Sequence, residues 1–396
     1  MKKSAGRNMS KLCSLLLTLA FVMSMLAGCK GKQEPNTNAE ATKAPQATTA
    51  VTTAPTEAAA AAGSYYAADA SVESIVKDAA GKGQVGNWGL GNEYEIQALL
   101  TKYGQPTTYL SQAFDMDGFD DNSILLASAM TYNELGLVKN SYDGGYKYGD
   151  SVKYIDMNEE GVAMLEDNIF CTKEFAQKNP NTVKAFIYAS MKGWEYACAN
   201  SKEAAEIVYK YGSSVSADHQ AYMAGEVKKL VETDMTGAAV SKYGNMDEKA
   251  MQQTLDLAKK YIKLEDSTAA DKLQTLKLDD IRDTSYWTDA MASSDGKFTP
   301  EKADVSIQLK WLPQAQFMGY YVALDKGYYK DAGLNVTIVP GGGDIGETTA
   351  VYTGQVDFGV TWVSNLIAAK AGGMDLFEIS QVFQRSGLVL VYKINK

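Results

Sequence analysis

Short apolar runs alternate with amphipathic segments in two parts of the chain. An apolar run of about four to eight residues between turn residues is typical of a buried strand, and apolar residues repeating with the helical period are typical of a surface helix. In the first part, the pattern predicts strands at 84–88, 108–114, 123–129 and 152–157 and helices at 72–80, 93–103 and 132–139. In the second part, it predicts strands at 305–310, 335–339, 356–361, 377–383 and 388–393 and helices at 314–326, 345–353 and 364–371.

A long helical region separates the two alternating parts. Its apolar spacing predicts helices at 181–211, 217–232 and 247–264, and the residues at 295–300 predict a loop before the second alternating part begins. Strands that alternate with helices form right-handed βαβ units around a mostly parallel sheet. The two series therefore predict two α/β lobes, with ligands bound beyond the carboxyl ends of their strands.

The N-terminal segment has the features of a secretory signal peptide. Four basic residues accompany an almost entirely apolar run at 12–26, and small residues lead to Cys29. The end of this leader, LAGC, resembles the lipobox at which bacterial lipoproteins are cleaved and diacylated. We therefore expect removal of 1–28 and lipidation of Cys29, which would anchor the protein at the extracytoplasmic face of the cell membrane. An uncleaved anchor is the alternative, although the apolar run is shorter than the roughly 20 residues that span a bilayer.

Residues 29–63 differ in composition from the rest of the chain. Ala, Thr and Pro dominate this segment, which has too little apolar surface to form a core. We predict a disordered tether between the lipidated cysteine and a folded body that begins at 64. The remaining residues, 64–396, are enough for two domains or one two-lobed domain.

The charge of the chain limits the classes of binding partner, and its cysteine content limits the possible disulfides. The full chain has a net charge of −10 at pH 7, and removal of the basic leader makes the mature chain more acidic. Nucleic acid and anionic lipid both need basic patches, so we expect no nucleic acid partner and no membrane contact beyond the lipid anchor. Cys171 and Cys198 are the cysteines left after the leader and the anchor, and they either pair or stay as two buried thiols.

Aromatic and amide side chains gather at the predicted carboxyl ends of the strands. Rings stack on the faces of a flat ligand, while amides and carboxylates read the donors and acceptors at its edges. The pattern therefore predicts a cleft for a planar, polar heteroaromatic ligand; the alternative is that these aromatics only cap the core. The candidate binding residues are Trp88, Asn92, Glu93, Tyr94, Tyr132, Asn133, Glu134, Trp311, Gln314, Tyr320, Tyr321 and Trp362.

The same stretches carry a resemblance to a known family. In the second part, the motifs are LKWLPQ (309–314), GYYVA (319–323), KGYY (326–329), GLNV (333–336) and GQVDFGV (354–360). In the first part, they are GNEYE (91–95), FDMD (114–117), AMTYNE (129–134) and GVAMLED (161–167). With these motifs the chain resembles the thiamine-pyrimidine-synthase-like family of ABC-transporter substrate-binding proteins over about three quarters of its length.

The resemblance implies an α/β, two-lobed type II periplasmic-binding-protein fold with the ligand cleft between the lobes. It also implies capture of a small heteroaromatic solute and its delivery to an ABC permease and ATPase complex, with no cofactor, no metal and no enzymatic activity. The ligand of such carriers is a thiamine-precursor pyrimidine or a riboflavin-like compound. A sensor lipoprotein that binds without transport is an alternative.

The order of the matching parts is rotated relative to that family, because its usual N-terminal part stands last here. One copy fits within 64–396, so we predict a circular permutation whose old ends are joined through 292–303. Residues 64–171 would then form the first lobe and the hinge, and 304–396 the second lobe. Residues 172–291 would be a helical continuation of the second lobe, although the pattern leaves open which lobe carries these helices. The new ends are expected near the hinge.

An enzyme of the same fold is the rival class. The resemblance extends to eukaryotic relatives that make the thiamine pyrimidine with pyridoxal phosphate, a histidine and a cysteine-rich iron motif. This chain has one histidine, His219, in a helical stretch away from the strand-end loops, and its two remaining cysteines cannot form that motif. The glycines at 341–343 lack the Lys-Ser/Thr of a phosphate loop, and Asp115 and Asp117 suit hydrogen-bonding or capping roles better than paired catalysis.

Overall fold

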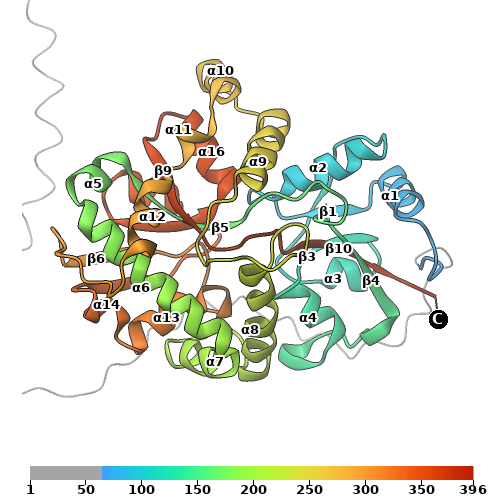
Figure 1. Cartoon of the computed structure of the whole chain (residues 1–396). Coiled ribbons are helices and arrows are strands. Elements are labelled where there is room, and N and C mark those ends of the chain that lie inside the picture. The colour runs from blue at the N-terminus through green and yellow to red at the C-terminus, as the bar shows by residue number, and fades with distance from the viewer. Residues whose placement is uncertain (1–64, 396) are drawn as a thin grey trace, which may run out of the picture. The chain divides into compact units, whose positions relative to one another are not determined.

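Two five-stranded sheets organise the residues that the computed structural model describes, 65–395 (Figure 1). The first sheet has the order β2-β1-β3-β10-β4, with β1 (Val85–Asn87), β2 (Leu110–Ser111), β3 (Leu126–Met130), β4 (Val152–Asp156) and β10 (Leu388–Lys393). The second has the order β7-β6-β8-β5-β9, with β5 (Asp167–Thr172), β6 (Asp304–Gln308), β7 (Asn335–Val339), β8 (Phe358–Trp362) and β9 (Leu376–Gln381). The predicted leader at 1–28, Cys29 and the tether at 29–63 lie outside the described residues.

The two sheets share one topology, in which an antiparallel strand occupies the fourth position. In the first sheet, β1 runs parallel to β2 and β3, while β10 runs antiparallel to β3 and β4. In the second, β6 runs parallel to β7 and β8, while β5 runs antiparallel to β8 and β9. Since β5 follows β4 along the chain and β10 follows β9, each sheet receives one strand from the series that built the other. This exchange defines lobe 1 around the first sheet and lobe 2 around the second, and it confirms the predicted two-lobed type II binding-protein fold.

The exchanged strands correct the lobe boundaries predicted from the sequence. β5 lies in lobe 2, whereas the sequence-based boundary extends the first lobe to 171. β10 lies in lobe 1, whereas the sequence-based second lobe extends through 304–396. Both strands are buried along nearly their whole length. A strand covered on both faces has the same apolar pattern in either sheet, so the pattern does not reveal which sheet it joins.

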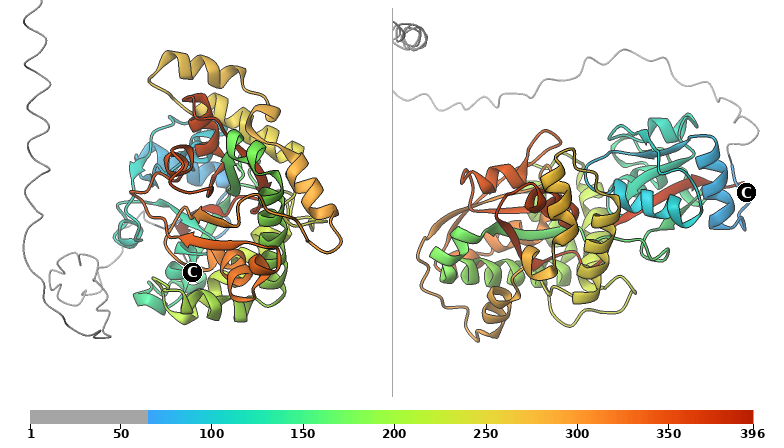
Figure 2. Two further views of the ribbon diagram at one scale, coloured as in Figure 1. Left: turned by 90° about the vertical axis from the view of Figure 1, so that its left-hand side faces the viewer. Right: turned by 90° about the horizontal axis from the view of Figure 1, so that it is seen from above.

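Helices cover both sheets, and most of them belong to lobe 2 (Figures 1 and 2). Lobe 1 carries α1 (Val72–Gly81), α2 (Glu93–Lys102), α3 (Asp117–Asp120), α4 (Glu134–Lys139) and the 3₁₀ turns η1 (Tyr142–Gly144) and η2 (Gly149–Ser151). Between β5 and β6 lie α5 (Lys173–Lys178), α6 (Pro180–Ala199), α7 (Ser201–Lys210), α8 (Ala217–Glu232), α9 (Glu248–Tyr261), α10 (Ser267–Thr275), α11 (Leu278–Ile281) and α12 (Thr284–Ala292). Lobe 2 continues with η3 (Ala315–Phe317), α13 (Met318–Asp325), α14 (Tyr328–Asp331), α15 (Glu347–Tyr352) and α16 (Val363–Ala371).

The long helical region is attached to lobe 2 and reaches across to lobe 1 at two helices. α6 packs against α13, and α7 packs against α13 and α8, so this region extends lobe 2. α8 also contacts α4 of lobe 1, and α9 contacts α2 of lobe 1 as well as α16 of lobe 2. These contacts resolve which lobe carries the helices, a point that the sequence leaves open. No helix within 65–395 has both the length and the apolar character needed to cross a membrane.

The two cysteines of the folded body are not linked to each other. Cys171 lies in β5 and Cys198 lies in α6, and both are free and buried. Of the two alternatives that the sequence leaves open, the structure therefore shows the buried thiols. Burial raises the pKa of both thiols well above the ordinary range, because desolvation disfavours the thiolate.

The two ends of the described chain pair with each other at the outer end of lobe 1. Tyr66 forms a parallel bridge with Ile394, and its amide donates to the Lys393 carbonyl at 2.9 Å. β10 begins beside the cleft, where Leu388 pairs with Met130, and runs away from lobe 2 (Figure 1). The expectation that the new ends lie near the hinge is therefore wrong. Adjacent ends are nonetheless what a circular permutation requires, and the permutation stays a prediction.

Helices α6 and α13 cross at a pair of glycines. A Cβ atom on Gly193 would lie 2.1 Å from the Gly319 carbonyl oxygen, and one on Gly319 would lie 2.2 Å from the Trp194 ring. The two backbones are therefore close enough that only glycine fits. Trp194 is buried and meets Tyr320 edge-on, with the ring centroids 5.6 Å apart. This crossing holds the start of α13, and with it the preceding loop at 309–314, against the longest helix of the structure.

We expect Gly193→Ala to lower the free energy of unfolding by about 1–3 kcal/mol, because the added methyl group overpacks the crossing. The matched control is Gly225→Ala on α8, where a Cβ atom meets nothing within 4 Å. That change should raise the free energy of unfolding by up to about 1 kcal/mol, since alanine restricts the unfolded chain and favours helix. Urea unfolding of both variants measures the difference. Equal effects of the two substitutions would show that the crossing is not tightly packed.

Candidate ligand-binding site

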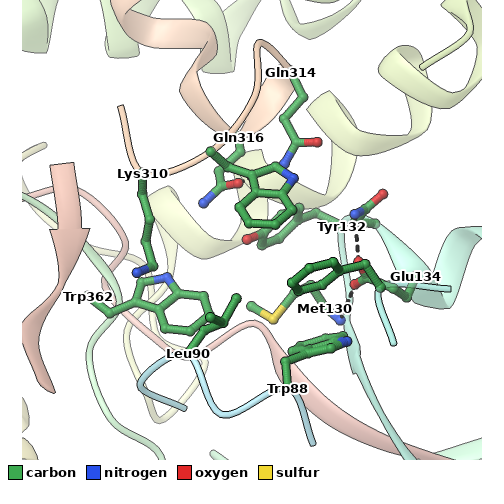
Figure 3. Close-up of a pocket in the computed structure, with 12 residues that line it drawn as sticks. Trp88, Leu90, Met130, Tyr132, Glu134, Lys310, Gln314, Gln316 and Trp362 are labelled. Carbon is green, nitrogen blue, oxygen red and sulfur yellow. Dashed lines mark hydrogen bonds between the residues drawn. The ribbon is translucent and has the colours of Figure 1, made fainter. Parts of the chain in front are cut away.

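A narrow cleft lies between the lobes, at the carboxyl ends of β1, β3, β6 and β8 (Figure 3). Lobe 1 contributes Trp88, Leu90, Phe114, Met130, Tyr132, Asn133 and Glu134, and lobe 2 contributes Lys310, Trp311, Gln314, Gln316 and Trp362. The structure thus brings seven predicted residues together: Trp88, Tyr132, Asn133, Glu134, Trp311, Gln314 and Trp362.

Aromatic rings from both lobes form most of the cleft wall. Trp88 follows β1, and its indole N–H donates to the Ala113 carbonyl at 3.0 Å, which fixes the ring. Trp311 of lobe 2 meets Phe114 of lobe 1 edge-on, with the centroids 5.1 Å apart. This aromatic contact crosses the cleft. Trp362 ends β8 and is nearly buried. Indole faces arranged in this way suit stacking on a planar ligand.

The polar edge from lobe 1 is built around Glu134, the first residue of α4. Its Oε2 accepts from the Met130 amide at 2.9 Å, and its Oε1 accepts from Asn133 Nδ2 at 2.7 Å. The Asn133 amide is thereby turned so that its nitrogen faces the carboxylate. Burial raises the pKa of Glu134 to about 7, although these hydrogen bonds act in the opposite direction. The group therefore titrates near neutral pH.

The polar edge from lobe 2 contains a buried ion pair. Lys310 Nζ lies 3.3 Å from Glu347 Oε1, and both side chains are about one-tenth exposed, at 10% and 9%. Thr361 also donates to Glu347. The ammonium group sits 4.5 Å from the centre of the Trp362 ring, within range of a cation–π interaction. The side of this ring that faces Lys310 is therefore occupied by a cation of the protein itself.

Two predicted tyrosines lie in the core instead of the cleft. Tyr320 is 1% exposed and packs edge-on against Trp194. Tyr321 is 3% exposed, and its ring lies against Tyr211, with the centroids 5.3 Å apart. Both residues belong to α13, which the crossing with α6 and α7 buries. The prediction that they stack on a ligand is wrong because the helix turns them toward these neighbouring helices.

The predicted residues Asn92, Glu93 and Tyr94 stabilise the turn after β1 and the start of α2. Asn92 accepts from Asn87 Nδ2 at 3.2 Å, and Glu93 accepts from the Gly91 amide at 2.7 Å. Tyr94 is half-buried and packs against the apolar core. Since all three lie outside the cleft, the structure corrects the sequence-based prediction for them. Their role is to hold the loop that carries Trp88 and Leu90.

Five cleft residues are absent from the sequence-based set: Leu90, Phe114, Met130, Lys310 and Gln316. Each lies within two residues of a motif or candidate that the sequence analysis singles out. Phe114 lies beyond β2, because the predicted strand at 108–114 contracts to Leu110–Ser111. The strand-end motifs therefore indicated the right part of the chain. Within them, the sequence analysis selected tryptophan and tyrosine as stacking residues and did not select phenylalanine, lysine or methionine.

A buried carboxyl pair lies where the chain crosses between the lobes. Ser386, on the second crossing, donates to Glu166 Oε1 at 3.0 Å and lies 3.3 Å from Glu95 Oε2. Glu166 is on the first crossing and also accepts from the Gly387 amide at 2.9 Å. Glu95 comes from α2 of lobe 1. Burial raises the pKa of both carboxyls, and the charge of Glu95 raises that of Glu166 further. This hinge pair ties the two crossings to α2.

The fold and the cleft are those of the type II periplasmic-binding-protein class. The chain matches the model of the family described as NMT1/THI5 like over residues 43–204 and 314–396, and it belongs to that family. Two Saccharomyces cerevisiae proteins, the 4-amino-5-hydroxymethyl-2-methylpyrimidine phosphate synthases THI11 and THI13, are each 25% identical to it over 88 residues. That segment is 22% of this chain and 26% of each yeast protein, so the chain spans about a quarter of the length of these curated relatives.

One solved structure also aligns with the chain. It is the crystal structure of AppA from Clostridium difficile, a protein assigned to peptide binding. The alignment covers 70% of this chain and 53% of that one, with 10% sequence identity and a TM-score of 0.26.

The hinge pair predicts a pH dependence of stability. A carboxyl with a raised pKa keeps its proton in the folded protein after the unfolded chain has lost it, so stability falls as the pH rises toward the raised pKa. We expect a lower melting temperature at about pH 8 than at about pH 5.5, and Glu95→Gln should reduce this difference because an amide carries no charge at either pH. Differential scanning calorimetry measures it. Glu248→Gln, at an exposed position, is the control and should keep the wild-type difference; an unchanged difference in Glu95→Gln would contradict the assignment.

Proposed function

We propose that this protein is an extracytoplasmic solute-binding protein that captures a planar nitrogen heterocycle and delivers it to an ABC permease. The observation that carries the proposal is the cleft itself, which Trp88, Trp311 and Trp362 line between the two lobes. Stacking on these rings recognises a flat ligand, and closure of the lobes around it removes it from water. The leader at 1–28 and the lipidation of Cys29 form part of the proposal, because they place the body outside the cell and attached to its membrane.

The polar groups of the cleft support a heterocycle over a plain hydrocarbon. Asn133 and Glu134 of lobe 1 and Gln314 and Gln316 of lobe 2 line the cleft and place polar side chains beside its aromatic rings. A thiamine-precursor pyrimidine or a riboflavin-like compound has both the flat face and the polar edge that this arrangement requires. The family and the names of the yeast relatives, which contain a substituted pyrimidine, agree with this class of ligand.

A synthase activity is the second candidate, and the names of the two yeast relatives favour it. The position of the single histidine argues against it. His219 Nδ1 lies 2.9 Å from Asp143, and the ring stacks on Tyr142 with the centroids 5.0 Å apart, outside the cleft. This histidine joins α8 to lobe 1. Incubation of the full chain with pyridoxal phosphate and ferrous iron, followed by mass spectrometry, tests the candidate; formation of the pyrimidine phosphate would establish it and overturn a purely binding role.

The binding function is tested by thermal shift of the purified full chain. The probes are 4-amino-5-hydroxymethyl-2-methylpyrimidine, thiamine and riboflavin, with taurine as a non-aromatic control. A ligand present at a thousand times its Kd should add about 4 kcal/mol of stability, whereas taurine should add none. The absence of a shift with all three heterocycles would overturn the proposal.

The stacking role of Trp311 gives a second measurement. We expect Trp311→Ala to weaken binding of the best heterocyclic probe by roughly tenfold or more, since one stacked aromatic ring contributes about 1–3 kcal/mol. Tyr352→Ala on α15 is the matched control, because that ring is 48% exposed and lies outside the cleft. Isothermal titration calorimetry compares the two variants. If both variants bind as the wild type does, Trp311 only packs against Phe114 and does not contact the ligand.

A further inference from the structure

A chain of buried hydrogen bonds connects the cleft to the hinge. Gln314 Nε2 donates to Gln316 Oε1 at 2.8 Å, and Gln316 Nε2 donates to Asp167 Oδ2 at 2.9 Å. Gln314 and Gln316 line the cleft (Figure 3), whereas Asp167 lies behind them at the start of β5. The three side chains are each at most 3% exposed. We refer to these three residues as the amide relay.

The carboxylate at its end determines the direction of the relay. An amide offers a donor at one end and an acceptor at the other, and nothing in its shape decides which end faces a neighbour. An ionised carboxylate only accepts, so Gln316 must turn its nitrogen toward Asp167. Its oxygen then faces Gln314, which must in turn present its nitrogen. The carbonyl oxygen of Gln314 is the end left outside the relay.

The main chain of Asp167 is held in place by two hydrogen bonds. Its main-chain carbonyl accepts from the amides of Val382 and Phe383 at 3.1 and 3.0 Å, which ties it to the second crossing between the lobes. Burial raises the pKa of Asp167 to about 7, while the Gln316 hydrogen bond and the charge of Lys310 favour its ionised form. Glu347 acts in the opposite direction, as a second negative charge nearby. Above neutral pH the relay therefore ends on a carboxylate.

We propose that Asp167 is a positioning residue that sets the hydrogen-bond polarity of the cleft, so that Gln314 presents its carbonyl oxygen and selects a ligand whose facing edge carries an N–H donor. The inference rests on the proposed function and deepens it, because it states which edge of the heterocycle is read. It applies equally to an amino group on a pyrimidine and to a ring N–H of a flavin. A heterocycle with a methyl group at that position leaves the Gln314 oxygen without a partner and binds less tightly.

Two matched pairs of probes measure this selectivity. The first pair is 4-amino-5-hydroxymethyl-2-methylpyrimidine and its analogue with a methyl group in place of the amino group. The second is riboflavin and 3-methylriboflavin. Calorimetric titration of the full chain at about pH 8, where Asp167 is ionised, should give a preference of roughly tenfold or more for the donor-bearing member of at least one pair.

Substitutions then show whether Asp167 positions the glutamines of the relay or only stabilises the fold. Asp167→Asn ends the relay on an amide, which permits either direction, and the preference should fall to about threefold or less. Asp167→Asn combined with Gln316→Glu moves the carboxylate one place along the relay and still forces Gln314 to donate, so the preference should return. Asp357→Asn is the control: this aspartate precedes β8, at the far end of lobe 2 from the cleft, and accepts from Ser306. It should keep the wild-type preference.

Each outcome is decisive. Failure of the wild type to bind any member of either pair overturns the proposed function, and this inference with it. Equal binding of both members by the wild type, a wild-type preference retained by folded Asp167→Asn, or a folded double variant that does not recover the preference overturns the inference alone. If Asp167→Asn does not fold, Gln314→Met provides the test, since it removes the acceptor and should abolish the preference while leaving binding of the methylated probes intact.

Discussion

The exchange of β5 and β10 between the two sheets is the constraint on which the rest of this structure depends. β4 reaches the first sheet only through β10, and β9 reaches the second only through β5. Neither sheet is therefore complete without a strand delivered from the other half of the chain. The segments that lead to β5 and to β10 both pass between the same two lobes, so these two crossings lie side by side and form a hinge. The cleft follows from that arrangement, since the parallel strands of both sheets end beside it.

The first crossing links the hinge to the cleft through two adjacent acids. Glu166 contacts Ser386 and Gly387 of the second crossing, whereas Asp167 contacts Gln316 next to the ligand space. Neighbouring side chains of an extended segment point to opposite faces, so consecutive residues serve opposite sides of the same backbone. A change in the charge of one acid is felt by the other, because both are buried and close. The contacts of the hinge and the contacts of the cleft therefore meet in one dipeptide.

Much of the fold and part of the site could be predicted from the sequence. The apolar pattern predicted β7, α8 and β10 with their observed bounds, because each has a clear period and clear turn residues at its ends. It missed β5, whose sequence DNIFCT begins with two polar residues that are buried among segments distant in the sequence. The aromatic residues of the cleft could be predicted because they stand at the ends of predicted strands. Tyr320 and Tyr321 were misplaced because helix rotation, which decides their direction, depends on the distant contact between Gly193 and Gly319.

The selectivity of the cleft was beyond sequence reasoning for a different reason. Gln314 is a candidate from the sequence and Gln316 stands two positions further on, but the residue that orients them lies about 150 positions away, at Asp167. That aspartate ends the motif GVAMLED (161–167), but nothing in the motif shows that its side chain contacts the glutamines. Its partner becomes apparent only when β5 has crossed into lobe 2. Long-range pairing of this kind is what the periodicity of a single segment cannot report.

The bridge between Tyr66 and Ile394 has a mechanical consequence. The described chain enters and leaves the protein through the same lobe, at the end farthest from lobe 2. Any load applied through the residues that precede 65 is therefore taken up first by lobe 1, and it reaches lobe 2 through the hinge crossings and through the contacts of α8 and α9 with lobe 1. Lobe 2 carries no external attachment in the part of the chain that the structure describes. Movement of lobe 2 relative to lobe 1 would therefore leave the paired ends of the described chain in place.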